Sequence, residues 1–115
     1  VAAGDFDGDG DIDIYAGKPV ISAKFGGLSG PCVRPVAIKL VYEVSRAVKI
    51  PIIGMGGVSR GEDAVEMLLA GAALVGVGTA VADRGINVYK KICNEILQYM
   101  EVMGYSSIKD IKPIE

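Results

Sequence analysis

The sequence predicts an α/β fold built from parallel β/α units, and three observations support this prediction. Residues 31–103 alternate between helical patterns and short apolar runs, in the order helix, strand, helix, strand, helix. The connections are short, and consecutive units of this kind place their strands in parallel with a right-handed crossover. Glycine clusters stand where the strands end, which is typical of loops that approach a ligand closely.

Helices are expected over residues 35–49, from Ser59 to Gly71, and over 87–103. Pro35 suits a first helical turn, where a missing N–H costs nothing. Ser59 and Glu62 form an S-x-x-E capping box, and Gly71 fits the position that ends a helix. Ser106 and Ser107 are expected to cap a final short helix that runs through Ile111. The buried stripe expected on the third helix comprises Tyr89, Ile92, Cys93, Ile96, Met100 and Met103.

Residues 50–55 and 73–77 are continuous apolar runs, which favour strands buried on both sides. Near the N-terminus, residues 12–15 and 19–22 are expected to form a short β-hairpin. A complete (β/α)₈ barrel takes ~250 residues, so this sequence of 115 residues indicates a fragment, a half-barrel or a smaller open α/β domain. An incomplete barrel exposes sheet edges and apolar surface. We therefore expect a homo-oligomer or a complementary half.

Composition and charge argue against several classes of function. The chain has no histidine, so the usual base near neutral pH is absent. Its net charge is −2, and its basic residues are not concentrated in one part of the sequence. We therefore expect no nucleic-acid partner. Cys32 and Cys93 lack a zinc-binding spacing; Cys93 is expected in the core and Cys32 in a loop. No apolar run approaches the ~20 residues of a membrane span, so we expect a cytoplasmic protein without a signal peptide.

The strongest functional signal is a pair of glycine-rich strand ends. One is GMGGVS at residues 54–59, and the other is VGVGT at residues 75–79. In barrels, the loops after the last two strands often form a phosphate site. Backbone N–H groups of Gly56, Gly57, Gly78 and Thr79 are candidates to bind one anion. The alternative is that these glycines only make tight β/α turns; their occurrence at consecutive strand ends favours phosphate binding.

Several motifs occur together in one order: KFGGLSGP at 24–31, IPIIGMGGV at 50–58, GAA at 71–73 and VGTA at 77–80. With these motifs the chain resembles the C-terminal third of dihydroorotate dehydrogenases, and most closely the two-subunit, NAD-linked class. The resemblance covers roughly residues 12–110. It implies the C-terminal part of a TIM (β/α)₈ barrel, with the short hairpin as an insertion before the glycine-rich loop.

The resemblance implies FMN as the cofactor. Its phosphate would bind the backbone at Gly56, Gly57, Gly78 and Thr79, and Gly30 would lie against the flavin. The reaction would be the oxidation of dihydroorotate to orotate in pyrimidine biosynthesis, with hydride passing to the flavin. Electrons would leave through a partner subunit that carries FAD and an iron–sulfur cluster.

The chain also departs from the family pattern. The catalytic cysteine of the family lies in an upstream loop that is absent here, and neither Cys32 nor Cys93 stands in that motif. Asp5 and Phe6 stand where the family has a substrate-binding Asn-Thr pair, and a flavin-contacting lysine is missing. We therefore assign no catalytic residue and expect this chain alone to be inactive.

Residues 1–14 differ in composition from residues 15–115, which form the expected partial barrel. Asp5, Asp7, Asp9 and Asp13 follow a D-x-D-G-D-G-x-x-D pattern, in which alternate carboxylates can converge on calcium. The segment resembles an integrin-type or VCBS repeat, and the alternative is a solvated acidic tail.

Three hypotheses follow from the sequence. The first is the FMN-binding portion of a dihydroorotate dehydrogenase. The second is a non-enzymatic calcium-binding module in which the acidic segment carries the function. The third is a fragment of a different phosphate-binding barrel. Flavin binding separates the first hypothesis from the second, and preference for FMN over other phosphorylated ligands separates it from the third.

Overall fold

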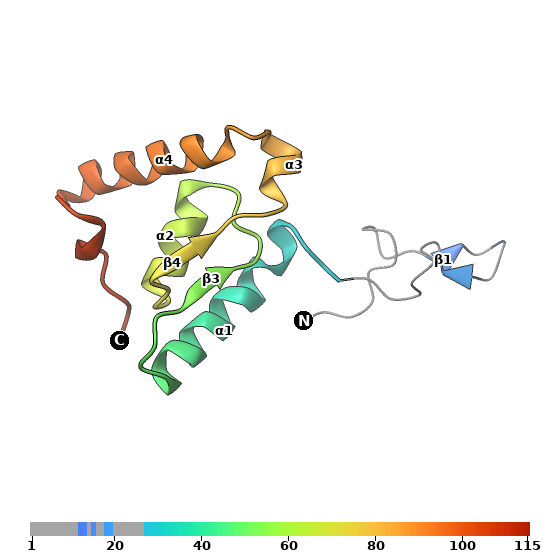
Figure 1. Ribbon diagram of the computed structural model, residues 1–115, viewed down its shortest axis with the longest axis horizontal. Helices are drawn as coiled ribbons and strands as arrows, with labels where there is room; N and C mark the ends of the chain where they lie inside the picture. The colour runs from blue at the N-terminus through green and yellow to red at the C-terminus, as the bar shows by residue number, and fades with distance from the viewer. Residues whose placement is uncertain (1–11, 14, 16–17, 20–26) are drawn as a thin grey trace.

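The computed structural model describes residues 12–13, 15, 18–19 and 27–115 of the chain (Figure 1). Two short strands and a 3₁₀ turn precede the main body: β1 (Ile12–Asp13), β2 (Lys18–Pro19) and η1 (Pro31–Val33). The main body then runs α1 (Arg34–Ala47), β3 (Ile53–Met55), α2 (Gly61–Leu69), β4 (Leu74–Gly76), α3 (Ala80–Arg84), α4 (Val88–Met103) and η2 (Ile108–Asp110). The predicted alternation of helix and strand is therefore confirmed.

β1 and β2 form the predicted hairpin. They pair antiparallel, with Ile12 opposite Pro19 and Asp13 opposite Lys18. The second strand begins at Lys18, one residue before the position expected from Pro19, because the backbone of Lys18 already pairs with Asp13. The other residues expected in the hairpin, 14 and 20–22, lie outside the described residues.

The second sheet consists of β3 and β4, which pair in parallel with Ile53 opposite Leu74 and Met55 opposite Gly76. α2 packs against both α1 and α4, and α1 and α2 contact the strands, as the arrangement in Figure 1 shows. The core lies between the helices and one face of this sheet, and its fully buried side chains include Met67 and Val88. This arrangement is the one expected of consecutive β/α units in a barrel.

Gly54 explains how closely β3 approaches α2. A β-carbon at Gly54 would lie 2.9 Å from the β-carbon of Ala72 and 3.3 Å from that of Met67. The distance to Ala72, which follows α2, is shorter than real β-carbons show, and the distance to Met67 of α2 is tighter than most, so β3 packs this closely because residue 54 has no side chain. The neighbouring Val75 of β4 points to the same side and packs against the core.

The prediction that both strands are buried on both sides is wrong for the described residues. Ile53, Met55 and Leu74 are 61%, 59% and 64% exposed. The physical reason is the alternation of a strand: its side chains point to opposite faces, and the helices cover one face only. The other face carries an apolar surface, defined here as the open sheet face (Ile53, Met55 and Leu74).

The start of α2 also differs from the prediction. The sequence suggested a capping box between Ser59 and Glu62, whereas the helix begins at Gly61 with Arg60 as its N-cap. Asp63, one residue further on, accepts hydrogen bonds from the backbone N–H groups of Ser59 and Arg60, both at 2.9 Å. At the other end, Gly71 adopts a φ of +107° as expected of the residue that ends a helix.

In the C-terminal half, the prediction for Cys93 is wrong and the prediction for the final short helix is confirmed. Cys93 is exposed rather than buried, because α4 packs on α2 through the faces that carry Ile92 and Met100. Ser107 caps the predicted final turn, η2, through its side chain, and this prediction is confirmed. The short helix α3 was not predicted.

Candidate functional site

One pocket lies at the carboxyl ends of β3 and β4, and it contains all five residues that the sequence singled out for the cofactor. Its volume is about 400 Å³. The five residues come from three segments: the loop before η1, the loop after β3 and the loop after β4. They are Gly30, Gly56, Gly57, Gly78 and Thr79. Segments separated by up to 49 positions in the sequence thus form one wall.

The three segments touch one another through their backbones and small side chains. A β-carbon at Gly57 would lie 2.7 Å from the carbonyl oxygen of Gly30. A β-carbon at Gly30 would lie 3.9 Å from Cγ2 of Thr79. Both glycines have a positive φ, +84° at Gly30 and +72° at Gly57, a conformation that other residues adopt only at a cost. Glycine is therefore a requirement of this geometry at both positions.

Gly56 and Gly78 play different parts in the wall. Gly56 has a φ of +124°, and a β-carbon there would lie 2.6 Å from the β-carbon of Ala37 on α1. A β-carbon at Gly78 would meet no atom of the described residues within 4 Å. Gly56 is thus required by packing, whereas Gly78 leaves room on the pocket side.

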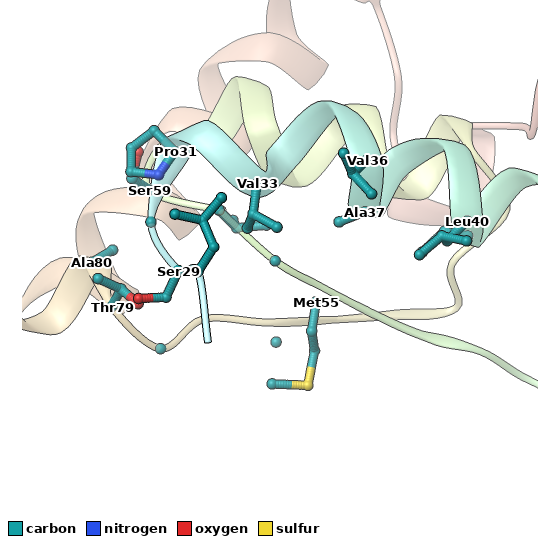
Figure 2. Close-up of a pocket in the computed structure, with 18 of the residues that line it drawn as sticks. Ser29, Pro31, Val33, Val36, Ala37, Leu40, Met55, Ser59, Thr79 and Ala80 are labelled. Atoms are coloured by element: carbon teal, nitrogen blue, oxygen red, sulfur yellow. The ribbon is translucent and has the colours of Figure 1, made fainter. Parts of the chain in front are cut away.

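The two ends of the pocket differ in chemistry, as Figure 2 shows. Ser29, Ser59 and Thr79 gather at one end, and we call this the polar end. Val36 and Leu40 of α1 lie at the other end. Met55 of the open sheet face also lines the pocket. An anion suits the polar end alone, because the apolar end offers it no hydrogen-bond donors from side chains.

Hydroxyl groups at the polar end are not equivalent. The Ser59 hydroxyl donates to Oδ2 of Asp63 at 3.1 Å, so its proton is directed away from the pocket. Ser29 and Thr79 are the other hydroxyl residues of the lining. Sequence reasoning named Thr79 and missed Ser29, although Ser29 directly precedes Gly30. It also missed Asp83, a carboxylate of the lining, because α3 was not predicted.

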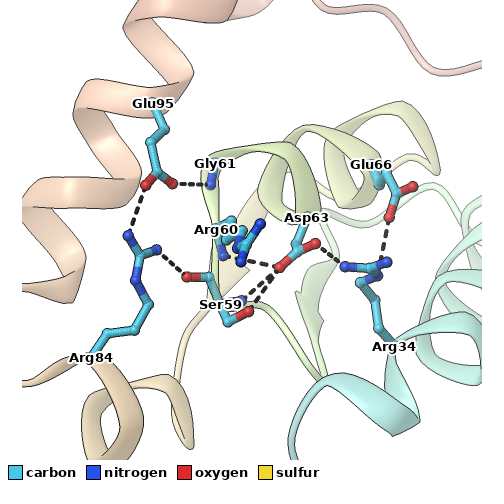
Figure 3. A network of polar contacts seen from close by, with 8 residues as sticks. All are labelled: Arg34, Ser59, Arg60, Gly61, Asp63, Glu66, Arg84 and Glu95. Carbon is cyan, nitrogen blue, oxygen red and sulfur yellow. Dashed lines mark hydrogen bonds and ion pairs between the residues drawn. The ribbon is translucent and has the colours of Figure 1, made fainter.

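Outside the pocket, Asp63 joins α2 to two neighbouring segments (Figure 3). Its carboxylate is buried, with the residue 3% exposed. It accepts from the backbone of Ser59 and Arg60, and it forms an ion pair with the Arg34 guanidinium. Arg34 also reaches Glu66, with 3.3 Å between Nε and Oε2.

A second set of contacts lies on the opposite side of Ser59. The Arg84 guanidinium of α3 donates to the carbonyl oxygen of Ser59 and to Oε1 of Glu95, the latter at 2.8 Å. Glu95 of α4 accepts in turn from the backbone N–H of Gly61. We call these five residues the clamp: Arg34, Ser59, Asp63, Arg84 and Glu95.

Two members of the clamp have shifted pKa values. The hydrogen bond from Arg84 holds the pKa of the Glu95 carboxyl below its usual range; burial opposes this effect, and the amide of Gly61 adds to it. The same hydrogen bond raises the pKa of Arg84. Both shifts favour the charged pair near neutral pH.

The remaining residues that the sequence singled out are the four aspartates proposed for calcium and Cys32. Asp5, Asp7 and Asp9 lie outside the described residues, and Asp13 lies in β1. In the part of the chain that the structure describes, no group of three or more His, Cys, Asp or Glu residues is placed to hold a metal ion. The calcium hypothesis therefore stays a prediction from the sequence. Cys32 is exposed, and its Sγ donates to the carbonyl oxygen of Ser29 at 3.3 Å.

None of the helices within the described residues is long and apolar enough to cross a membrane. This finding concerns α1, α2, α3 and α4 alone.

Comparison with known proteins gives matches over most of the chain. The family model for dihydroorotate dehydrogenase matches residues 5–100. The catalytic subunit of dihydroorotate dehydrogenase B (NAD⁺) from Pyrococcus horikoshii is 50% identical over 100 residues, which cover 87% of this chain and 33% of that protein. The corresponding subunit from Methanosarcina mazei is 52% identical over 100 residues, covering 87% and 32%. The chain thus spans about a third of the length of these relatives.

The solved structures agree with the sequence relatives. A ligand-free dihydroorotate dehydrogenase from Eimeria tenella has a TM-score of 0.72 and 29% identity, covering 78% of this chain and 26% of that chain. The match to the family model includes the three glycine segments of the pocket and every member of the clamp. On these matches and on the fold, the chain belongs to the dihydroorotate dehydrogenase family.

Proposed function

We propose that this chain forms the part of a flavin-dependent dihydroorotate dehydrogenase that binds the phosphate of FMN. One observation carries the proposal: three glycine segments from different parts of the chain meet at the polar end of one pocket. Family membership favours FMN over other phosphorylated ligands of barrel proteins.

Backbone amides are the proposed phosphate ligands. Gly56 and Gly57 supply two N–H groups from the loop after β3, and Gly78 and Thr79 supply two from the loop after β4. Amide groups bind phosphate well where no side chain blocks the approach, and the open space at Gly78 meets this condition. Gly30, which touches Gly57, is proposed to lie against the flavin on the neighbouring side.

Bound at this site, FMN would supply the hydride acceptor for the oxidation of dihydroorotate to orotate. Removing the accompanying proton takes a base, and the titratable side chain of the described pocket lining is Asp83. Asp83 lies on α3, the helix that directly follows Thr79, so it is close in the chain to the proposed phosphate ligands and is not proposed as a base beside the flavin ring. We propose that the base comes from a part of the protein outside this chain, so that the chain holds the cofactor and does not itself complete the reaction.

The names of the relatives describe catalytic subunits of NAD⁺-linked enzymes. We propose that the complete protein likewise works with a second subunit, which carries FAD and an iron–sulfur cluster and passes electrons to NAD⁺. Dihydroorotate and orotate are the proposed substrate and product of that complex.

A titration of flavin fluorescence tests the proposal. The 115-residue chain is titrated into FMN and, separately, into riboflavin, which has the same ring system without the phosphate. We expect FMN to bind at least about tenfold more tightly, because hydrogen bonds to a charged group contribute ~1.5–3 kcal/mol. Equal affinity for both flavins, or no binding, contradicts the proposal. Ribose 5-phosphate as a competitor tests whether the pocket prefers FMN over a simpler phosphate ester.

A further inference from the structure

The clamp connects the same three segments that meet in the pocket, but from the outside (Figure 3). Arg34 lies four residues after Gly30, and it pairs with Asp63. Ser59 lies two residues after Gly57, and both its amide and its hydroxyl bind Asp63. Each contact therefore fixes a backbone that carries a pocket glycine a few positions away.

The third segment is fixed by Arg84, which lies five residues after Thr79. Its guanidinium binds the carbonyl oxygen of Ser59 and the carboxylate of Glu95. Glu95 in turn accepts from the amide of Gly61, so α4 holds α3 and the start of α2 together. Ser59 is thus held by Asp63 on one side and by Arg84 on the other.

We propose that Asp63, Arg34, Arg84 and Glu95 are positioning residues for phosphate binding: they set the relative positions of the three glycine segments without touching the ligand themselves. This inference rests on the proposed function of the pocket. Asp63, Arg34, Arg84 and Glu95 are not part of the pocket lining, and hydrogen bonds to a phosphate weaken steeply when donors are displaced or misaligned.

The proposal and a simple effect of charge predict opposite changes in FMN affinity when an acid of the clamp is removed. Two acids of the clamp, Asp63 and Glu95, lie near a pocket proposed to bind an anion. If their charges acted on the phosphate through space, removing them would tighten FMN binding, because like charges repel. If they position the segments, removing them weakens FMN binding.

The first test is Asp63→Asn in the full chain, with FMN and riboflavin titrated side by side. Asparagine keeps the size of the side chain but loses the ion pair with Arg34. We expect the preference for FMN over riboflavin to fall about tenfold, the factor that corresponds to one lost hydrogen bond to a charged group. If Asp63 contributed to general stability alone, the variant would bind both flavins more weakly by the same factor. An unchanged preference for FMN would therefore overturn the proposal.

Glu43→Gln is the matched control. It removes one negative charge from an exposed pair on α1, where Glu43 lies 2.8 Å from Lys39, and neither residue lines the pocket. We expect this variant to retain the FMN preference of the unchanged chain. A fall as large as that of Asp63→Asn would show that loss of any acidic residue has the same effect, and the proposal would fail.

Glu95→Gln is a second variant. It should disturb the fold less than Asp63→Asn, because the Glu95 side chain is 32% exposed. Hydrogen exchange provides a measurement that needs no ligand: in both variants, the amides of residues 56–60 should exchange at least about threefold faster relative to those in the middle of α4. Unchanged exchange at residues 56–60 would overturn the inference. If the unchanged chain shows no FMN preference but the variants show this local increase, the proposed function fails while the clamp's effect on the segments stands.

Discussion

A β-carbon at Gly57 would lie 2.7 Å from the carbonyl oxygen of Gly30 and 2.9 Å from the backbone nitrogen of Arg34. The loop after β3 and the loop before η1 therefore meet backbone to backbone. This contact, together with the φ of +72° at Gly57, leaves no room for a side chain at position 57.

Gly57→Ala is accordingly expected to lower the free energy of unfolding by about 1–3 kcal/mol, through the clash and the unfavourable φ together. Urea denaturation followed by circular dichroism measures the change. Gly104→Ala is the control, because Gly104 has nearly the same φ, +71°, and a β-carbon there meets no described atom within 4 Å. The control should lose about 1 kcal/mol. Equal losses in the two variants would argue against the close contact with Gly30.

Gly78→Ala is expected to lower FMN affinity without a matching loss in the free energy of unfolding. A β-carbon at Gly78 has free space, so we expect the free energy of unfolding to change by less than about 0.5 kcal/mol. The methyl group would nevertheless stand beside the amides proposed to bind phosphate, and FMN affinity should fall at least about tenfold. Flavin titration of the folded variant measures this effect. Unchanged FMN affinity would remove Gly78 from the proposed phosphate site.

Acid should weaken the clamp at Glu95. Its pKa in the folded chain is lowered from the ordinary value of 4.5, so the stability that it contributes is present above pH 4.5 and is lost as pH falls through the lower, folded value. Arg84 stays charged throughout this range. The thermal unfolding temperatures of the unchanged chain and of Glu95→Gln should therefore differ at pH 7 and become equal as the pH falls below 4.5. A difference that persists undiminished at pH 3 would contradict the assignment.

The open sheet face should drive self-association when this chain is studied alone. Ile53, Met55 and Leu74 expose an apolar surface that water disfavours. At tens of micromolar, we expect sedimentation velocity to detect dimers or larger species. Leu74→Glu should weaken association at least about tenfold, since burying one such side chain contributes ~1.5–3 kcal/mol. Val102→Glu, at a position 85% exposed on α4, should leave it unchanged. A monomeric, cooperatively unfolding chain would refute this prediction.

The order of helices and strands followed from the sequence because it depends on local patterns. Apolar spacing, Pro35 near a helix start and Gly71 at a helix end are all read within a few residues. The convergence of Gly57 and Thr79 also followed, because the carboxyl ends of parallel strands meet at one edge, whereas Gly30 was expected at the site only from the family resemblance. Their role as cofactor ligands remains a proposal.

Other features depend on distant residues and could not be predicted locally. Glu62 and Asp63 both stand close to the start of α2, and the choice between them involves Arg34, which lies 29 positions earlier. Cys93 falls on an apolar stripe, yet whether that stripe is covered depends on which helices pack beside α4. α3 has five residues, too few to show a helical period.

The polar end of the pocket and the whole clamp come from one continuous stretch, residues 29–95. A recombination event with a breakpoint ahead of Ser29 would therefore transfer the polar end of the pocket and its supporting residues as a single genetic block. Proteins that differ entirely before this point can inherit the same means of holding a phosphate group. Selection can then alter what happens at the other end of the ligand without rebuilding this one.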